Sequence, residues 1–179
     1  MQVELTKNYF ELFNFPVTFD VDVDNMKHRY RDLQRALHPD KYANATDRER
    51  MLSVQQTSFL NEAHTTLKDP LLRARYILKL HGMAIGDEPN TVKDTAFLMQ
   101  QMELREQLAE IKGQSDPLGE LDKFMATVKT EMAQRITRLS ELFGNMSEEN
   151  KQQAYEITQQ MQFLKKLQSE AEQLEESLL

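Results

Sequence analysis

Few residues of this 179-residue chain have the types and spacing that chemistry requires. The chain has no cysteine, which excludes disulfides, cysteine nucleophiles and thiolate ligands for zinc or iron–sulfur clusters. It contains no glycine-rich nucleotide loop and no Ser/His/Asp arrangement typical of a hydrolase. No two histidines have metal-ligand spacing with a third ligand nearby; the four are His28, His38, His64 and His81. We therefore predict a protein that is not an enzyme and that holds no metal ion or cofactor.

Three aspartates at alternate positions, Asp20, Asp22 and Asp24, resemble the start of a calcium-binding loop. Such a loop needs glycine at its sixth position and glutamate at its twelfth, where this chain has Asn25 and Arg31. The pattern therefore favours turn and capping roles. Aspartate is a good N-cap residue, so we predict that Asp24 caps the helix that follows it.

The helix predicted from Asp24 to Leu37 or His38 carries the most informative pattern. At 100° per residue, four basic side chains lie within an arc of about 80°, namely Lys27, Arg31, Arg35 and His38. The apolar side chains lie on another face, between about −60° and −120°, namely Met26, Tyr30, Leu33 and Leu37. One side should be buried while the other forms a positive stripe. The stripe fits a solvated face, a nucleic-acid contact or an acidic protein partner; the acidic chain and the interrupting Asp32 and Asp40 favour the acidic partner.

The basic stripe ends at the tripeptide His38-Pro39-Asp40, which Lys41 follows. Pro39 should end the helix, because the residue before a proline disfavours helical backbone. It also stiffens the turn. The histidine and the aspartate are thereby placed on a loop between two helices, where functional residues are often found.

Residues 8–80 resemble the J-domain family. The resemblance rests on the segments NYFELFNF, KHRYRDLQRALHPDK and NEAHTTLKDPLLRARY. In that family, the HPD loop and the preceding basic helix dock on a DnaK-class chaperone and stimulate its ATP hydrolysis, so the J-domain protein is not itself the ATPase. The resemblance implies that seven residues bind the chaperone: Lys27, Arg31, Arg35, His38, Pro39, Asp40 and Lys41.

Turn residues divide the chain into the elements that must position these groups. We predict helices at 8–15, 24–37 or 38, 47–68, 70–80, 92–112, 118–143 and 147–177. No segment shows the period-2 alternation of a strand, so the expected fold is all-α: an N-terminal J-domain helical hairpin packed with a C-terminal three-helix bundle. The segment HGMAIGDEPN predicts a boundary. The expected parts are a J-domain at 1–81, a short connector at 82–91 and the bundle at 92–179.

The two parts differ in charge. Residues 1–81 hold 12 Lys/Arg and 11 Asp/Glu, net +1, and residues 82–179 hold 10 and 18, net −8, which together give the −7 of the chain. No run approaches the roughly 18 apolar residues of a membrane-spanning helix. The first residues also lack the apolar region of a signal peptide. We predict a cytoplasmic protein that binds neither membrane nor nucleic acid.

The bundle contains apolar residues that its core does not need. On the helix predicted at 92–112, a narrow stripe at helical spacing comprises Phe97, Leu104, Leu108 and Ile111. Leu98, Met99 and Met102 lie off this stripe, at about 100°, 200° and 140° from Phe97. Phe163 similarly flanks the stripe of the last helix, which comprises Ile157, Met161, Leu164, Leu167 and Ala171. Periodicity leaves two possibilities open: these residues pack on the J-domain or another bundle helix, or they form an exposed patch for a partner.

Two bundle segments, DTAFLMQQMELREQL at 94–108 and FLKKLQSEAEQLEESLL at 163–179, resemble the HscB family of J-type co-chaperones in bacterial iron–sulfur cluster assembly. With the J-domain, this resemblance spans nearly the whole chain. It implies delivery of the cluster scaffold IscU to the DnaK-class chaperone HscA. It also implies a scaffold-binding face formed by Leu98, Met99, Met102, Glu103, Arg105 and Phe163. The alternatives are a J-domain co-chaperone for a different client and a structural or nucleic-acid adaptor without chaperone coupling.

Overall fold

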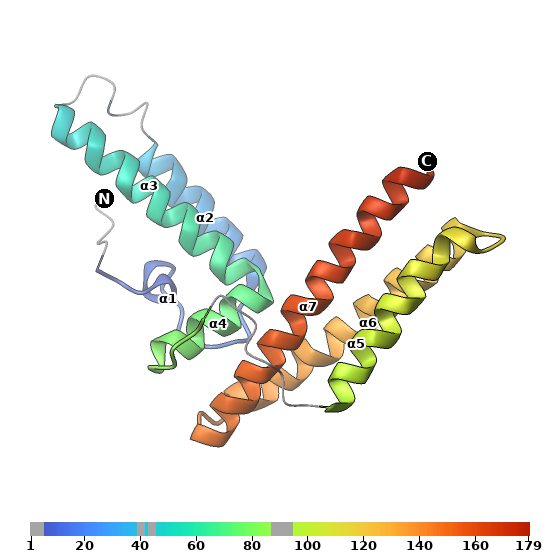
Figure 1. Cartoon of the computed structure of the whole chain (residues 1–179). Helices are drawn as coiled ribbons and strands as arrows, with labels where there is room; N and C mark the ends of the chain where they lie inside the picture. Colours follow the sequence, from blue (N-terminus) through green and yellow to red (C-terminus); the bar gives the residue numbers. More distant parts are fainter. Residues whose placement is uncertain (1–5, 39–41, 43–45, 87–94) are drawn as a thin grey trace. The chain divides into compact units, whose positions relative to one another are not determined.

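The computed structural model describes residues 6–38, 42, 46–86 and 95–179 of the chain. All regular structure within these residues is helical, which confirms the predicted all-α class. The chain divides into two compact units, Met1–His81 and Gly82–Leu179. The α-helices are α1 (Tyr9–Leu12), α2 (Val23–Leu37), α3 (Asp47–Lys68), α4 (Pro70–Leu80), α5 (Thr95–Glu110), α6 (Pro117–Phe143) and α7 (Glu148–Leu178) (Figure 1).

In the first unit, α2 and α3 lie side by side as a helical hairpin, and α3 also contacts α1 and α4 (Figure 1). The predicted apolar face of α2 is buried at Met26, Leu33 and Leu37. The largest fully buried side chains of the unit come from all four helices and the turn after α1, namely Phe10, Phe13, Met26, Leu37, Leu60, Leu67 and Leu78. Full burial of each such side chain stabilises the fold by about 1.5–3 kcal/mol.

The start of α2 differs from the prediction. The N-cap is Asp22, whose carboxylate accepts a hydrogen bond from the Asn25 backbone N–H at 2.9 Å. Asp24 lies within the first helical turn, where its negative charge faces the positive end of the helix dipole. The predicted end of α2 at Leu37 is confirmed. Both aspartates are suitable caps by type, so composition alone could not separate them.

The first helix is also shorter than predicted. The α-helix spans Tyr9–Leu12 rather than 8–15, because Asn8 forms its N-cap and Asn14 adopts a positive φ of 52°. Asparagine tolerates this left-handed backbone better than most residues, and the conformation ends the helix. By contrast, the predicted bounds of α3 and α4 are confirmed at both ends.

In the second unit, α5, α6 and α7 form a three-helix bundle (Figure 1). Its buried core draws on all three helices and the short 3-10 turn after α5, namely Leu104, Ile111, Leu121, Phe124, Val128, Leu164, Leu167 and Ala171. The predicted stripe of α5 is therefore confirmed at Leu104 and Ile111, and Phe97 is 3% exposed.

The ends of the bundle helices differ slightly from the prediction. The α-helical backbone of α5 ends at Glu110 and a 3-10 turn, η2, covers Ile111–Gly113, while residues 92–94 of the predicted helix lie outside the described residues. The Asp116 carboxylate caps α6 through the Gly119 N–H, and the Ser147 hydroxyl caps α7 through the Asn150 N–H. None of the described helices combines the length and the apolar character needed to cross a membrane.

Candidate functional site

The predicted basic stripe lies on the exposed side of α2. Lys27, Arg31 and Arg35 are exposed along the helix, and His38 is exposed directly after it. Among the described residues, Arg35 pairs with the Asp32 carboxylate at 3.9 Å, and both side chains are about four-fifths exposed, at 80% and 78%. An ion pair this exposed contributes little to the stability of the fold. The charges of the stripe therefore lie at the protein surface.

Side chains from α3 fix the end of α2. The Leu37 carbonyl, one of the groups that a helix end leaves without a helical partner, accepts hydrogen bonds from the Ser53 hydroxyl at 2.8 Å and the Thr57 hydroxyl at 3.3 Å. Ser53 is 2% exposed and Leu37 is fully buried. The backbone at His38 then leaves the helical conformation, with φ −54° and ψ 127°. The chain thus leaves the hairpin at a fixed point, immediately before the HPD tripeptide.

Pro39, Asp40 and Lys41 lie outside the described residues. Their chaperone-binding roles therefore remain predictions. The position at which the chain enters this segment is described, because Leu37 and His38 precede it directly.

The fourth Lys/Arg residue of α2, Arg29, contacts the rest of its unit and is not part of the stripe. Its guanidinium donates to the backbone carbonyls of Phe13 and of Asn14. It also lies over the ring of Phe15, 4.8 Å from the centroid. Arg29 is displaced by about 200° from Lys27 around the helix, so the periodicity separates it from the stripe.

His64 is part of the hairpin and not of a ligand set. Its ring stacks on Tyr30 of α2 with centroids 4.0 Å apart, and the Tyr30 hydroxyl donates to Asn61 Oδ1 at 2.9 Å. Burial, with a smaller contribution from the charge of Lys68, lowers the pKa of His64. Among the described residues, no group of three His, Asp or Glu side chains could hold a metal ion.

The second surface lies on the bundle and is centred on the apolar patch of α5, which we define as Leu98, Met99 and Met102. These side chains are 40%, 61% and 72% exposed. The possibility that they pack on another bundle helix is therefore wrong for all three. Their exposure contrasts with the burial of Phe97 and Leu104 on the same helix, at 3% and 4%. Contiguous exposed apolar side chains of this kind are typical of protein-binding sites.

The other residues predicted for this face adjoin the apolar patch. Phe163 of α7 is partly buried against the bundle core, with its ring edge-to-face to Phe97 at 5.8 Å. The Arg105 guanidinium lies over the Phe163 ring, 5.4 Å from the centroid, and 3.8 Å from the Glu170 carboxylate. Glu103 is exposed on α5. The bundle thus brings Arg105 and Phe163 into direct contact from two different helices.

Sequence reasoning missed Arg135 on α6. Together with Gln100 of α5 and Gln160 of α7, its side chain lines a hollow that Met99 and Glu103 also line. A hydrogen bond from Arg135 lowers the pKa of Glu131, and a bond to Gln100 acts in the same direction against the effect of burial. The only available signal was a basic residue on a bundle helix, and its partners are set by the three-dimensional packing.

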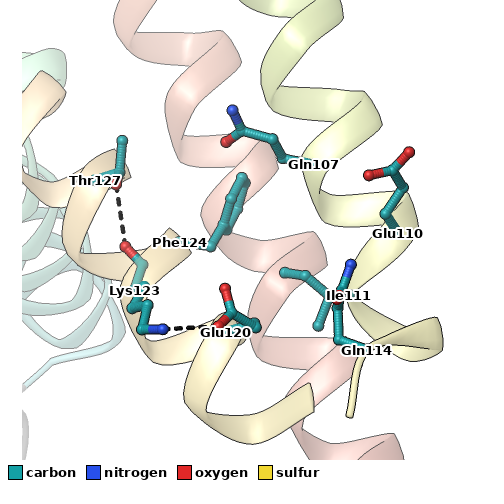
Figure 2. A pocket seen from close by; sticks show the side chains of 8 residues that line it. All are labelled: Gln107, Glu110, Ile111, Gln114, Glu120, Lys123, Phe124 and Thr127. Carbon is teal, nitrogen blue, oxygen red and sulfur yellow. Dashed lines mark hydrogen bonds and ion pairs between the residues drawn. The ribbon is translucent and has the colours of Figure 1, made fainter. Parts of the chain in front are cut away.

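A second hollow lies at the other end of α5, between η2 and the first turns of α6 (Figure 2). Phe124 and Ile111 supply apolar side chains to its lining, and Gln107, Glu110 and Gln114 supply polar ones (Figure 2). The Lys123 ammonium is 2.7 Å from the Glu120 carboxylate. The lining also includes Thr127, whose hydroxyl donates to the Lys123 carbonyl of its own helix at 3.1 Å.

Comparison with known proteins places this geometry in a family. Residues 93–172 match the family model described as the HSCB C-terminal oligomerisation domain. The "Co-chaperone protein HscB homolog" of Shewanella baltica (strain OS195) is 42% identical over 172 residues, covering 96% of this chain and 99% of that relative. The chain belongs to the HscB family of co-chaperones.

Solved HscB structures agree with the fold. "Chaperone HscB from Vibrio cholerae" has a TM-score of 0.86 and 36% identity, covering 97% of this chain and 100% of that one. "Crystal structure of human co-chaperone protein HscB" has a TM-score of 0.88 and 28% identity, covering 100% of this chain and 87% of that one. Membership of the HscB family carries the co-chaperone role.

Proposed function

We propose that this chain binds the iron–sulfur scaffold protein IscU, delivers it to the DnaK-class chaperone HscA and stimulates ATP hydrolysis by HscA. The cluster chemistry then belongs to the scaffold, because this chain has no cysteine to ligate a cluster through thiolates. The observation that carries the proposal is the exposed apolar patch of α5 beside Phe163, in a chain that also carries an exposed basic stripe before an HPD tripeptide.

The basic stripe supports the chaperone contact. Lys27, Arg31 and Arg35 present three positive charges on one helix face, within a chain whose net charge is −7. A local positive surface steers association with an acidic partner surface and speeds the encounter. His38-Pro39-Asp40 would then act on the docked chaperone. Stimulation of hydrolysis requires that these residues bind the hydrolysis-competent state of HscA more tightly than the other state.

The bundle supports the scaffold contact. The apolar patch supplies an exposed hydrophobic centre, and Glu103 and Arg105 supply charges of both signs at its border. This arrangement of an apolar centre with a polar rim is typical of protein interfaces. Methionine also adapts its shape to a partner surface, which suits Met99 and Met102. Holding scaffold and chaperone on one chain raises their effective concentration for each other without new chemistry.

One assay tests the proposal: ATP hydrolysis by purified HscA with this chain, in the presence and absence of IscU. Replacement of His38, Pro39 and Asp40 together by alanine should abolish stimulation and leave IscU binding unchanged. Met51 and Val54 provide a control, because they are exposed apolar residues of α3 outside the basic stripe. Their replacement by alanine should leave stimulation intact.

Three outcomes would count against parts of the proposal. Normal stimulation by the triple variant would overturn the J-domain assignment. Stimulation without any measurable IscU binding would indicate a co-chaperone for a different client. Binding to nucleic acid that falls steeply with salt, without any effect on HscA, would favour the adaptor alternative.

A further inference from the structure

The side chain of Arg135 connects all three helices of the bundle. From α6, its guanidinium donates to Gln160 Oε1 on α7 at 3.0 Å and to Gln100 Oε1 on α5 at 3.1 Å. It also donates to Glu131 of its own helix, at 2.6 Å to Oε2 and 3.0 Å to the carbonyl oxygen. The side chain is only 11% exposed. Charge-assisted hydrogen bonds in such surroundings are stronger than those at an exposed surface.

Arg135 also begins a series of ring contacts that reaches the protein surface. Its guanidinium carbon lies 5.4 Å from the centroid of the Phe97 ring. Phe97 contacts Phe163 edge-to-face, with centroids 5.8 Å apart and an interplanar angle of 90°. The Arg105 guanidinium carbon in turn lies 5.4 Å from the centroid of the Phe163 ring. The series thus runs from the Arg135 cation on α6 through the rings of Phe97 and Phe163 to the exposed Arg105 cation on α5.

Core packing also holds α5 against the bundle, because Leu108 is partly buried against the core. Within the helix, Phe97 and Leu104 are its buried side chains. Arg135 contacts Phe97 directly and bonds to Gln100, the residue that follows Met99. Because side chains project at about 100° per residue, a small rotation of α5 would displace the whole apolar patch.

We propose that Arg135 is a positioning residue of the scaffold-binding face. It fixes the rotation of α5 through Gln100 and Phe97, and it fixes the ring of Phe163 through Phe97. The scaffold then meets Leu98, Met99 and Met102 already in place, which lowers the ordering cost of binding. This inference rests on the proposed function of the face.

The test compares Arg135→Met with Arg138→Met. Arg138 lies one turn further along α6 and donates to Glu141 and to Gln153 of α7, without a bond to α5. Both substitutions remove an arginine that joins helices, but only the first removes a contact with α5. For Arg135→Met we expect the Kd for purified IscU to rise about tenfold, equivalent to about 1.4 kcal/mol. Arg138→Met should bind like the wild-type protein.

A second readout reports position and not stability. With ¹³C-labelled methionine methyl groups, Arg135→Met should shift the Met99 and Met102 resonances of the free protein, whereas Arg138→Met should not. A merely stabilising role would lower the melting temperature yet leave the Kd unchanged below it. If Arg135→Met does not fold, Gln100→Leu keeps Arg135 but removes the hydrogen bonds of Gln100 to Arg135 and Glu131, and it should raise the Kd about threefold.

Two results would overturn the inference. One is that Arg135→Met binds IscU with wild-type affinity, or that Gln100→Leu does so if Arg135→Met does not fold. The other is an equal loss of affinity in Arg138→Met. Met102→Ala in the same assay separates this inference from the proposed function. If Met102→Ala also binds normally, the scaffold-binding face itself is wrong; if it binds weakly while Arg135→Met does not, only the positioning role is wrong.

Discussion

Leu98 and Leu118 form a matched pair that tests whether the apolar patch binds a partner. Both are leucines of the bundle, and they are 40% and 41% exposed. Leu98 lies in the patch on α5, whereas Leu118 lies at the start of α6. Truncation to alanine therefore removes a similar amount of exposed apolar surface in each case. Only the Leu98→Ala substitution should weaken binding to IscU.

The expected magnitude follows from the exposed fractions. Full burial of a leucine or methionine side chain is worth about 1.5–3 kcal/mol. Scaled by its exposed 40%, covering Leu98 is worth about 0.6–1.2 kcal/mol, or a roughly three- to sevenfold change in Kd. Met102 is 72% exposed, so Met102→Ala should cost about 1.1–2.2 kcal/mol, or roughly 6- to 40-fold.

Isothermal titration calorimetry of each variant with purified IscU measures these changes, and circular dichroism checks that helicity is retained. The loss of affinity should increase with the exposure of the replaced side chain. Met102→Ala should bind IscU more weakly than Leu98→Ala, and Leu118→Ala should bind it like the wild-type protein. Equal affinities for all three variants would refute the reasoning. A comparable loss from Leu118→Ala would also refute it, because binding would then depend on the general apolar surface of the bundle.

Two further predictions concern the hairpin. Ser53→Ala leaves the Leu37 carbonyl with only the longer hydrogen bond from Thr57. The free energy of unfolding should therefore fall by about 1–3 kcal/mol, and HscA stimulation should decrease. As a control, Ser58→Ala, at an exposed position of the same helix, should change neither quantity. The lowered pKa of His64 means that the unfolded chain takes up protons first as the pH falls through about 6.5. Stability should therefore decline over that range, and His64→Phe, which retains a ring against Tyr30, should decline less in urea titrations at pH 7.5 and 5.5.

The helices that could be predicted to the residue are those with complete local signals. Thr46 and Glu49 form a capping box at the start of α3, and Asp69 followed by Pro70 opens α4. The predicted N-cap of α2 was wrong by two residues, because Asp22 and Asp24 are equally suitable caps by residue type. Only the placement of the preceding turn decides between them.

Some features of the functional surfaces could be predicted from single helices, and others depend on contacts between helices. Periodicity separated the basic stripe from the buried face of α2, because both are properties of one helix. It also showed that Leu98, Met99 and Met102 leave the core stripe of α5, but their exposure depends on whether another helix covers them. The role of Arg135 depends on all three bundle helices at once, since its partners come from α5, α6 and α7. No single-helix pattern contains that information.

If this chain delivers the scaffold to the chaperone, the chaperone-binding and scaffold-binding surfaces must lie on the same molecule. Consider an equimolar mixture of two variants: one with alanine at His38, Pro39 and Asp40, and one with Met102→Ala. Each retains the surface that the other lacks, but neither can hold scaffold and chaperone together. A short tether provides an effective concentration on the order of millimolar, far above micromolar free protein. The IscU-dependent part of HscA stimulation in the mixture should therefore not exceed that of Met102→Ala alone. Full restoration would mean that scaffold and chaperone act on HscB-type chains independently, and that the physical link between the two units is not required.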